Sequence, residues 1–273
     1  MRVSGNFLLT RSVFVAALAV LMLNCASSQQ RDEAKFSYQN LYQDRYERGY
    51  GGIIPVTLER GESYSGTISH DQKYLYFSSN TSGNYDIYLR DLNDVFSVPV
   101  VTTATNQREP SISPDGKYLV YVDDELDPDG DIILLKVNPK KLIELHRDRE
   151  QPGDEWFASR AKNLTNSEKK RIRSRDANPA WSPDGNWIAY SSDLVPQHAD
   201  DLGPGAGALQ NIWLMPVSNP EEKRQLTTKG GVMPSFSPDG KRIVYISYEG
   251  AGSAGAVYEI DIASGKRRRF TSG

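Results

Sequence analysis

The sequence is short of the residues that build disulfide frameworks and metal clusters. Its 273 residues include one cysteine, Cys25, and three histidines. A single cysteine excludes a disulfide within the chain and a zinc site made of several thiolates. None of the histidines belongs to a His-Glu-x-x-His arrangement, and no Gly-x-Ser-x-Gly nucleophile elbow occurs. We therefore expect no cofactor and no catalytic residues.

The chain also lacks a strong excess of either charge. Its formal net charge is −3 and its pI is about 5.7. This balance gives no general attraction to nucleic acid, and we interpret the basic run Lys266–Arg269 as solvated charge. Fifteen tyrosines against four methionines favour strands over helices.

No apolar run is long enough to span a bilayer. The longest, Val13–Leu23, has eleven residues and would rise about 16 Å as a helix, against a hydrocarbon core of about 30 Å. With Arg2 before it, the run is typical of a signal peptide. Leu21–Cys25 resembles a bacterial lipobox, although Asn24 stands where a small residue is usual. We expect residues 1–25 to be a lipoprotein signal peptide with lipidation at Cys25, and the polar residues 26–55 to be a tether.

A repeat organises the rest of the chain. A Ser-Pro-Asp-Gly turn precedes an alternating, β-branched and aromatic run in three places, and Ser69–Gln72 is a degenerate fourth copy. Proline presets φ, aspartate bonds its own backbone, and glycine takes the positive φ that closes a hairpin. The twelve turn residues are Ser113, Pro114, Asp115, Gly116, Ser182, Pro183, Asp184, Gly185, Ser237, Pro238, Asp239 and Gly240.

Two further marks follow each turn. The first is Asp/Asn-Ile-Tyr/Trp-Leu or a variant, at Asp86, Asp131, Asn211 and Ala256. The second is an apolar residue plus threonine, ending at Thr102, Thr165, Thr227 and Thr271, with one extra copy at Val56-Thr57. The spacing predicts four units of four strands preceded by one extra N-terminal strand. Small sheets at this period indicate β-propeller blades, because one such sheet cannot bury both faces alone.

These residues resemble the WD-like repeat of TolB-like propellers, over residues 56–273. The resemblance implies an all-β propeller of the bacterial cell envelope that binds envelope proteins or outer-membrane lipoproteins. Such propellers normally close with six blades, whereas four are recognisable here. Three explanations stay open: a fragment of a longer gene product, self-association edge to edge, or an incomplete ring closed by a partner.

Two segments are longer than the repeat needs. From Gly185 to Asn211 there are 26 residues, against 14–16 in the other units, and Asn138–Asn163 is also long. The long loop Asp193–Gln210 and the long link Asn166–Asn178 should neighbour each other on one rim. Long loops on a rigid scaffold are where binding usually resides. The candidate partner-binding residues there are Lys169, Lys170, Arg171, Arg173, Asp200 and Asp201.

One segment resembles a calcium loop. Asp127, Asp129 and Asp131 alternate, but the glutamate that a helix-loop-helix calcium site needs is replaced by Asn138. The same segment is the expected loop between two strands, so no metal site is assigned and calcium is the alternative.

Two functions are compatible with these observations. The first is a non-catalytic, lipid-anchored scaffold at the outer membrane, on its periplasmic face or the cell surface, that binds proteins and no nucleic acid. The alternative is an enzyme, or an enzyme's accessory propeller, acting on peptides or glycans. The second would need acids that converge on a channel mouth, which a sequence does not reveal.

Overall fold

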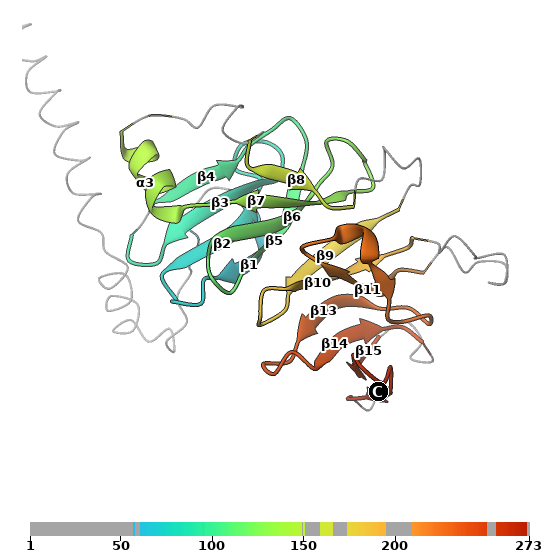
Figure 1. The fold of residues 1–273 in the computed structure, drawn as a ribbon. Helices are drawn as coiled ribbons and strands as arrows, with labels where there is room; N and C mark the ends of the chain where they lie inside the picture. The colour runs from blue at the N-terminus through green and yellow to red at the C-terminus, as the bar shows by residue number, and fades with distance from the viewer. Residues whose placement is uncertain are drawn as a thin grey trace, which may run out of the picture. The chain divides into compact units, whose positions relative to one another are not determined.

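The four repeat units fold as four separate antiparallel sheets (Figure 1). This computed structural model describes residue 57 and residues 61–94, 96–148, 150, 159–165, 174–194, 209–249 and 255–271. The chain forms two units, residues 1–56 with 93–95, and residues 57–92 with 96–273. All four sheets belong to the second unit. The expected extra strand at Val56 lies outside the described residues and stays a prediction.

Each sheet is a meander of four strands in chain order, which we call blades I to IV. Blade I comprises β1 (Ser63–Ile68), β2 (Tyr74–Ser79), β3 (Asp86–Asp91) and β4 (Ser97–Val101). Blade II comprises β5 (Gln107–Ile112), β6 (Tyr118–Asp123), β7 (Asp131–Lys136) and β8 (Ala161–Asn163). Blade III comprises β9 (Asp176–Trp181), β10 (Trp187–Ser192), β11 (Asn211–Pro216) and β12 (Arg224–Gln225). Blade IV comprises β13 (Val232–Phe236), β14 (Arg242–Ser247), β15 (Ala256–Asp261) and β16 (Arg267–Arg269). The predicted fold class, all-β with four four-stranded blades, is confirmed.

Within the ranges that the structure describes, two helical segments lie between strands. The α-helix α3 (Pro139–Arg147) occupies part of the long Asn138–Asn163 segment, and Asn138 caps it by accepting the Lys141 N–H. The short 3-10 helix η3 (Pro220–Glu222) precedes β12. The repeat had marked the first segment as an insertion without indicating a helix. Among the described residues, no helix is long and apolar enough to cross a membrane.

The Ser-Pro-Asp-Gly turns have the predicted geometry. In blade II the Ser113 hydroxyl donates to Asp115 over 2.7 Å and accepts the Tyr118 N–H over 2.9 Å. Gly116 has a φ of 70°, and Gln72 adopts 57° at the same place in blade I without being glycine. In blade III the equivalent serine hydroxyl holds the pKa of Asp184 below its usual range. The turn residues are therefore structural.

The Asp/Asn mark and the threonine mark hold the outer strands together. The Thr165 hydroxyl donates to Asp131 over 2.9 Å and accepts the Ile132 N–H over 3.0 Å. In blade III, the Thr227 hydroxyl likewise donates to the Asn211 side chain and accepts the Ile212 N–H. The two sequence marks are thus the two halves of one hydrogen-bonded clasp.

The clasp changes in the first and last blades. In blade I a register shift lies between Ile87 and Tyr88, and the backbone N–H of Thr103 instead donates to Asp86 over 3.3 Å. In blade IV the Val257 N–H still donates to the Thr271 hydroxyl, but Ala256 offers no side-chain acceptor. In blade IV, therefore, only one of the two hydrogen bonds of the clasp forms.

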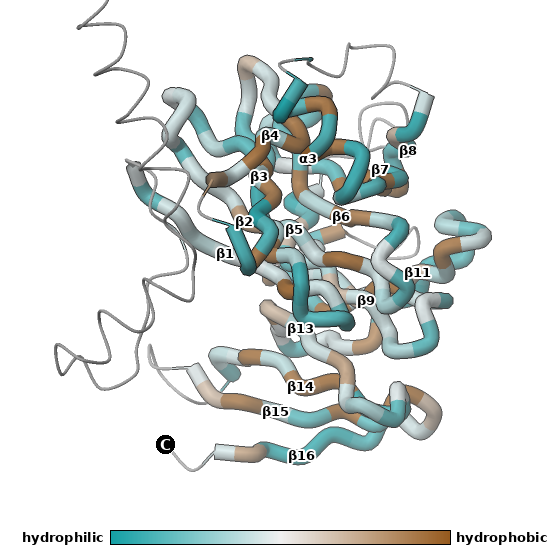
Figure 2. Tube along the Cα trace, turned by 90° about the vertical axis from the view of Figure 1, so that its left-hand side faces the viewer, coloured by the Kyte–Doolittle hydropathy of each residue, from teal (hydrophilic) through white to brown (hydrophobic). Residues whose placement is uncertain are grey.

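The core consists of three apolar clusters between successive sheets. Leu89 with Leu119 exemplifies the cluster between blades I and II, Ile132 with Tyr190 that between blades II and III, and Ile212 with Tyr245 that between blades III and IV. Each of these six side chains is at most 1% exposed to solvent. In Figure 2 the apolar colour runs along strands such as β14, whereas β16 is mainly polar. Each sheet therefore buries its face on the next, as propeller blades do.

Candidate functional site

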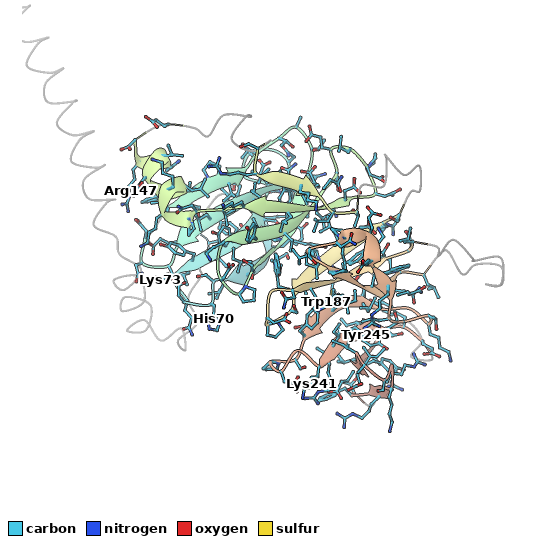
Figure 3. All side chains as sticks on the ribbon, in the orientation of Figure 1. His70, Lys73, Arg147, Trp187, Lys241 and Tyr245 are labelled. Atoms are coloured by element: carbon cyan, nitrogen blue, oxygen red, sulfur yellow. The ribbon has the colours of Figure 1, made fainter. Side chains whose placement is uncertain are left out.

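The strand directions define two faces of the propeller unit. The four Ser-Pro-Asp-Gly-type turns lie at one end of the sheets, which we call the hairpin face. The loops between second and third strands, together with the links from blade to blade, lie at the other end, which we call the link face. Figure 3 shows His70 and Lys73 together at the hairpin end of blade I and Lys241 at that end of blade IV.

Exposed apolar side chains gather on the link face. The described residues include seven large apolar side chains that are exposed. Only Ile68 lies at the hairpin end of its strand. The other six belong to link-face loops or link-face strand ends: Tyr64, Leu126, Leu209, Met233, Tyr248 and Phe270. This uneven distribution makes the link face the candidate interaction surface.

Strained backbone also lies toward this face. The first strand of every blade contains a β-bulge with a left-handed residue that is not glycine: Ser65, Glu109, Asn178 and Met233, with φ of 46–56°. Left-handed non-glycine residues persist only where the surrounding structure holds them, and bulges re-aim the side chains beside them. The spacing of the repeat carried no signal for these bulges.

The bulges hold one blade to the next. The Asn178 N–H donates to Glu109 over 2.5 Å, and the Met233 N–H donates to Asn178 over 3.3 Å. Ser78, in β2, accepts the Glu109 N–H over 3.2 Å. The bulges of blades II, III and IV are therefore each fixed by a side chain of the preceding blade, which connects the link-face ends of the first strands.

The predicted partner-binding residues Lys169, Lys170, Arg171, Arg173, Asp200 and Asp201 lie outside the described residues. The structure does describe residues at the ends of these two segments. The Arg175 N–H donates to Asp193 over 2.6 Å, and the Gln210 side chain donates to the Arg175 carbonyl over 3.2 Å. The end of the long link therefore lies beside both ends of the long loop on the link face. Cys25 and the tether also lie outside the described residues.

The hairpin face carries a hollow of about 450 Å³ that all four blades line. Ile68 and His70 come from blade I, and Trp181 and Phe236 from blades III and IV. Trp181 donates its indole N–H to the Ser111 carbonyl over 3.0 Å, which joins blades II and III. The described residues that line this hollow include no aspartate or glutamate.

Several buried carboxyl groups lie near the link-face ends of the strands, and two of them have strongly raised pKa values. Burial raises the pKa of Asp123 to about 6 and the pKa of Asp176 to about 7. Asp176 is 2% exposed and accepts a hydrogen bond from the Ser174 hydroxyl over 3.2 Å. Shifted carboxyl pKa values occur at active sites and also in structural networks. The Oδ1 atom of Asp176 has no hydrogen-bond partner among the described residues, so the hydroxyl groups near Asp176 satisfy only part of this carboxyl group.

The structure separates the calcium candidates by role. Asp127 accepts the Asp129 N–H over 3.0 Å and so shapes the turn, while Asp131 belongs to the clasp of blade II. Asp129 is exposed. In the part of the chain that the structure describes, no three histidine, cysteine or acidic side chains are placed to hold a metal ion.

Solved structures with a similar fold include TolB proteins. The chain is similar to TolB from Acinetobacter baumannii, with 21% identity and a TM-score of 0.56 over 79% of this chain and 45% of that one. It is also similar to a putative TolB from Agrobacterium tumefaciens, with 20% identity and a TM-score of 0.55 over 78% of this chain and 63% of that one. The chain thus spans about half to two thirds of the length of these structures.

A peptidase carries a similar propeller. A puromycin-hydrolysing peptidase of Mycobacterium tuberculosis matches with 12% identity and a TM-score of 0.52, over 80% of this chain and 30% of that one. No protein-family model and no curated protein matches the sequence. At these identities the likenesses establish the fold, a TolB-like β-propeller, and the function has to be argued from the site.

Proposed function

We propose that this TolB-like propeller is a non-catalytic scaffold of the bacterial envelope that binds a protein partner through its link face. The concentration of six of the seven exposed large apolar side chains on that face carries the proposal. Aromatic and other apolar anchors supply much of the binding energy of protein interfaces, and a rigid rim presents them at low entropic cost. The fold of TolB supports an envelope setting.

The lipid at Cys25 is part of the same proposal. The apolar run before Cys25 and the polar residues after it give a signal peptide and a tether, and two or three acyl chains bind a membrane firmly. The anchor would place the propeller at the outer membrane, on the periplasmic face or the cell surface. Its partners would then be envelope proteins or outer-membrane lipoproteins, and edge-to-edge self-association is the alternative.

Photo-crosslinking in intact cells tests the link face. A photoreactive amino acid at Leu126 or Tyr248 should give a discrete crosslinked product. The same amino acid at Lys117 or Lys241, which are exposed on the hairpin face, should give none. Mass spectrometry of the product identifies the partner. A Cys25→Ser variant should move from the membrane fraction to the soluble fraction of these cells.

The crosslinking result can contradict the proposal directly. Equal products from both faces, or products from the hairpin face alone, would show that the exposed apolar side chains do not mark the binding surface. The alternative of a peptide- or glycan-processing propeller is favoured by the fold shared with the puromycin-hydrolysing peptidase. Incubation with peptide and glycan panels separates the two functions, because a scaffold retains a ligand without turning it over.

A further inference from the structure

A second hollow, of about 410 Å³, opens between blades I and II at the link face. Residues from the end of β4, from β6 and its following loop, from the start of β7 and from β8 line it. They are Val101, Thr102, Thr103, Tyr121, Asp123, Glu125, Leu126, Asp131, Ile133, Ala161 and Asn163. Its volume lies within the range of pockets that enclose ligands.

One part of the wall of this hollow is apolar. Val101 and Tyr121 are buried, Ile133 is half-buried, and Leu126 at the mouth is 55% exposed. The walls can therefore bury a methylene stem. Leu126 belongs to the exposed apolar set of the link face, so the hollow is continuous with the surface proposed to bind the partner.

The polar lining is acidic. Asp123 and Asp131 are 7% and 1% exposed, and Glu125 is exposed at the rim. Asp123 accepts the Glu125 N–H over 2.8 Å, and Asp131 accepts the Asn163 side-chain N–H over 2.8 Å. The described side chains that line the hollow include three carboxylates and no lysine, arginine or histidine. The pKa of Asp123 is raised to about 6 by burial and by the negative charge of Glu125, so a cation in the hollow would favour the ionised form.

We propose that this hollow receives a lysine or arginine side chain of the protein partner, with the methylene stem against Val101 and Ile133 and the charged end beside Asp123. Long basic side chains combine an apolar stem with a charged end, which matches apolar walls and an acidic lining. Complementary charge also sets the specificity and rate of association. The assignment rests on the proposed function, since it names the chemistry that the partner presents to the link face.

Short peptides test the occupant on the full chain. The probes are acetylated and amidated leucine–lysine–leucine and the same peptide with norleucine in place of lysine, compared by isothermal titration calorimetry. The lysine peptide should bind saturably with a Kd of about 1 mM or tighter, and the norleucine peptide at least about tenfold more weakly. Saturable binding with equal affinity for both peptides, or no saturable binding of the lysine peptide, overturns the proposal.

Two variants place the site. Asp123→Asn should weaken binding of the lysine peptide about tenfold, and Glu125→Gln by a smaller factor because its side chain is exposed. Glu144→Gln makes the same change of charge on α3, at the hairpin end of blade II, and should leave affinity unchanged. Asp123→Asn should also keep or raise the melting temperature, since burial disfavours the charge that it removes.

Loss of affinity in Glu144→Gln as large as in Asp123→Asn would mean attraction by net charge alone, and the hollow would not be the site. Crosslinks from Tyr248, on blade IV, are independent of this hollow. If they persist while the peptides fail to bind, the basic occupant is wrong and the scaffold function stands.

Discussion

Blades III and IV share one backbone pattern but present different chemistry on corresponding faces. In blade III, Trp187 of β10 and Leu214 of β11 line the hollow against blade IV. In blade II, Tyr118 and Leu134 occupy the same positions against blade III. In blade IV these positions hold Arg242 and Glu259, whose side chains form an ion pair of 3.3 Å, and Arg268 of β16 adds a second one of 3.0 Å.

Replacing the aromatic residue and the leucine by an arginine and a glutamate changes which surroundings stabilise this face of the sheet. An aromatic ring beside a leucine is stable when another sheet covers it, whereas an arginine–glutamate pair is stable in water. The far face of blade IV is therefore suited to solvent or a polar partner. Edge-to-edge self-association through this face would have to desolvate the ion pairs, which is costly unless each charge keeps a partner.

The largest expected effect separates the packed face of blade III from the far face of blade IV. Leu214→Ala should lower the free energy of unfolding by about 2–4 kcal/mol, because Leu214 is 2% exposed between two blades. Val257→Ala, on the far face of blade IV and only half-buried, should cost less than about 1 kcal/mol. Urea unfolding of both variants measures the difference. Equal losses would mean that the far face is covered in the folded protein.

A buried carboxyl group gives the next effect. Asp176 is the first residue of β9 in blade III, and Gly231 takes the corresponding place in blade IV. Only blade III therefore has a titratable carboxyl group at this position. Burial raises the pKa of Asp176 to about 7, so the native state binds the proton more tightly than the unfolded chain. The free energy of unfolding should therefore fall as the pH rises from about 4 to 7, and low pH retains the stability.

Asp176→Asn should remove this pH dependence and raise the free energy of unfolding at pH 8 by about 1–3 kcal/mol, because the amide is not charged and avoids the cost of burying a carboxylate. Thermal unfolding of the two proteins between pH 5 and 8 measures the difference. Parallel stability curves across this range would show that Asp176 titrates normally.

The clasp gives the smallest effect. Thr227→Val leaves both the Asn211 side chain and the Ile212 N–H without the Thr227 hydroxyl and should cost about 1–2 kcal/mol. Thr271→Val in blade IV removes only the bond to the Val257 N–H, at an exposed position, and should cost less than about 0.5 kcal/mol. Chemical denaturation of the pair checks the order, and a reversed order would refute the clasp.

Much of the fold was predictable because its signals are local. Ser182–Gly185 specifies a turn from the chemistry of four adjacent residues, and the period of the turns predicts blades. The position of the two long segments on one rim also followed from counting, and the bonds between Asp193, Arg175 and Gln210 agree with it. The helix α3 was missed, because Pro139–Arg147 lies inside an insertion where the repeat offers no template.

The candidate site was less predictable because its features depend on neighbours distant in sequence. The left-handed Glu109 and Asn178 carry no local mark, and each is held by a bond from another blade. The hollow between blades I and II joins Val101 to Asn163, which no single repeat contains. Asp131 was marked in the sequence by the repeat and by the calcium-like segment, but nothing local indicated that it lines one hollow together with Asp123.

The sequence by itself determined the hairpins, the four-strand unit and the number of recognisable blades, because turn chemistry and side-chain alternation act over a few residues. Only the tertiary structure decided which carboxyl groups are buried, which apolar side chains remain exposed on the link face, and which blade face carries ion pairs instead of a packed core. These properties depend on the solvent exposure of each side chain, and exposure is set by the sheets that pack beside it.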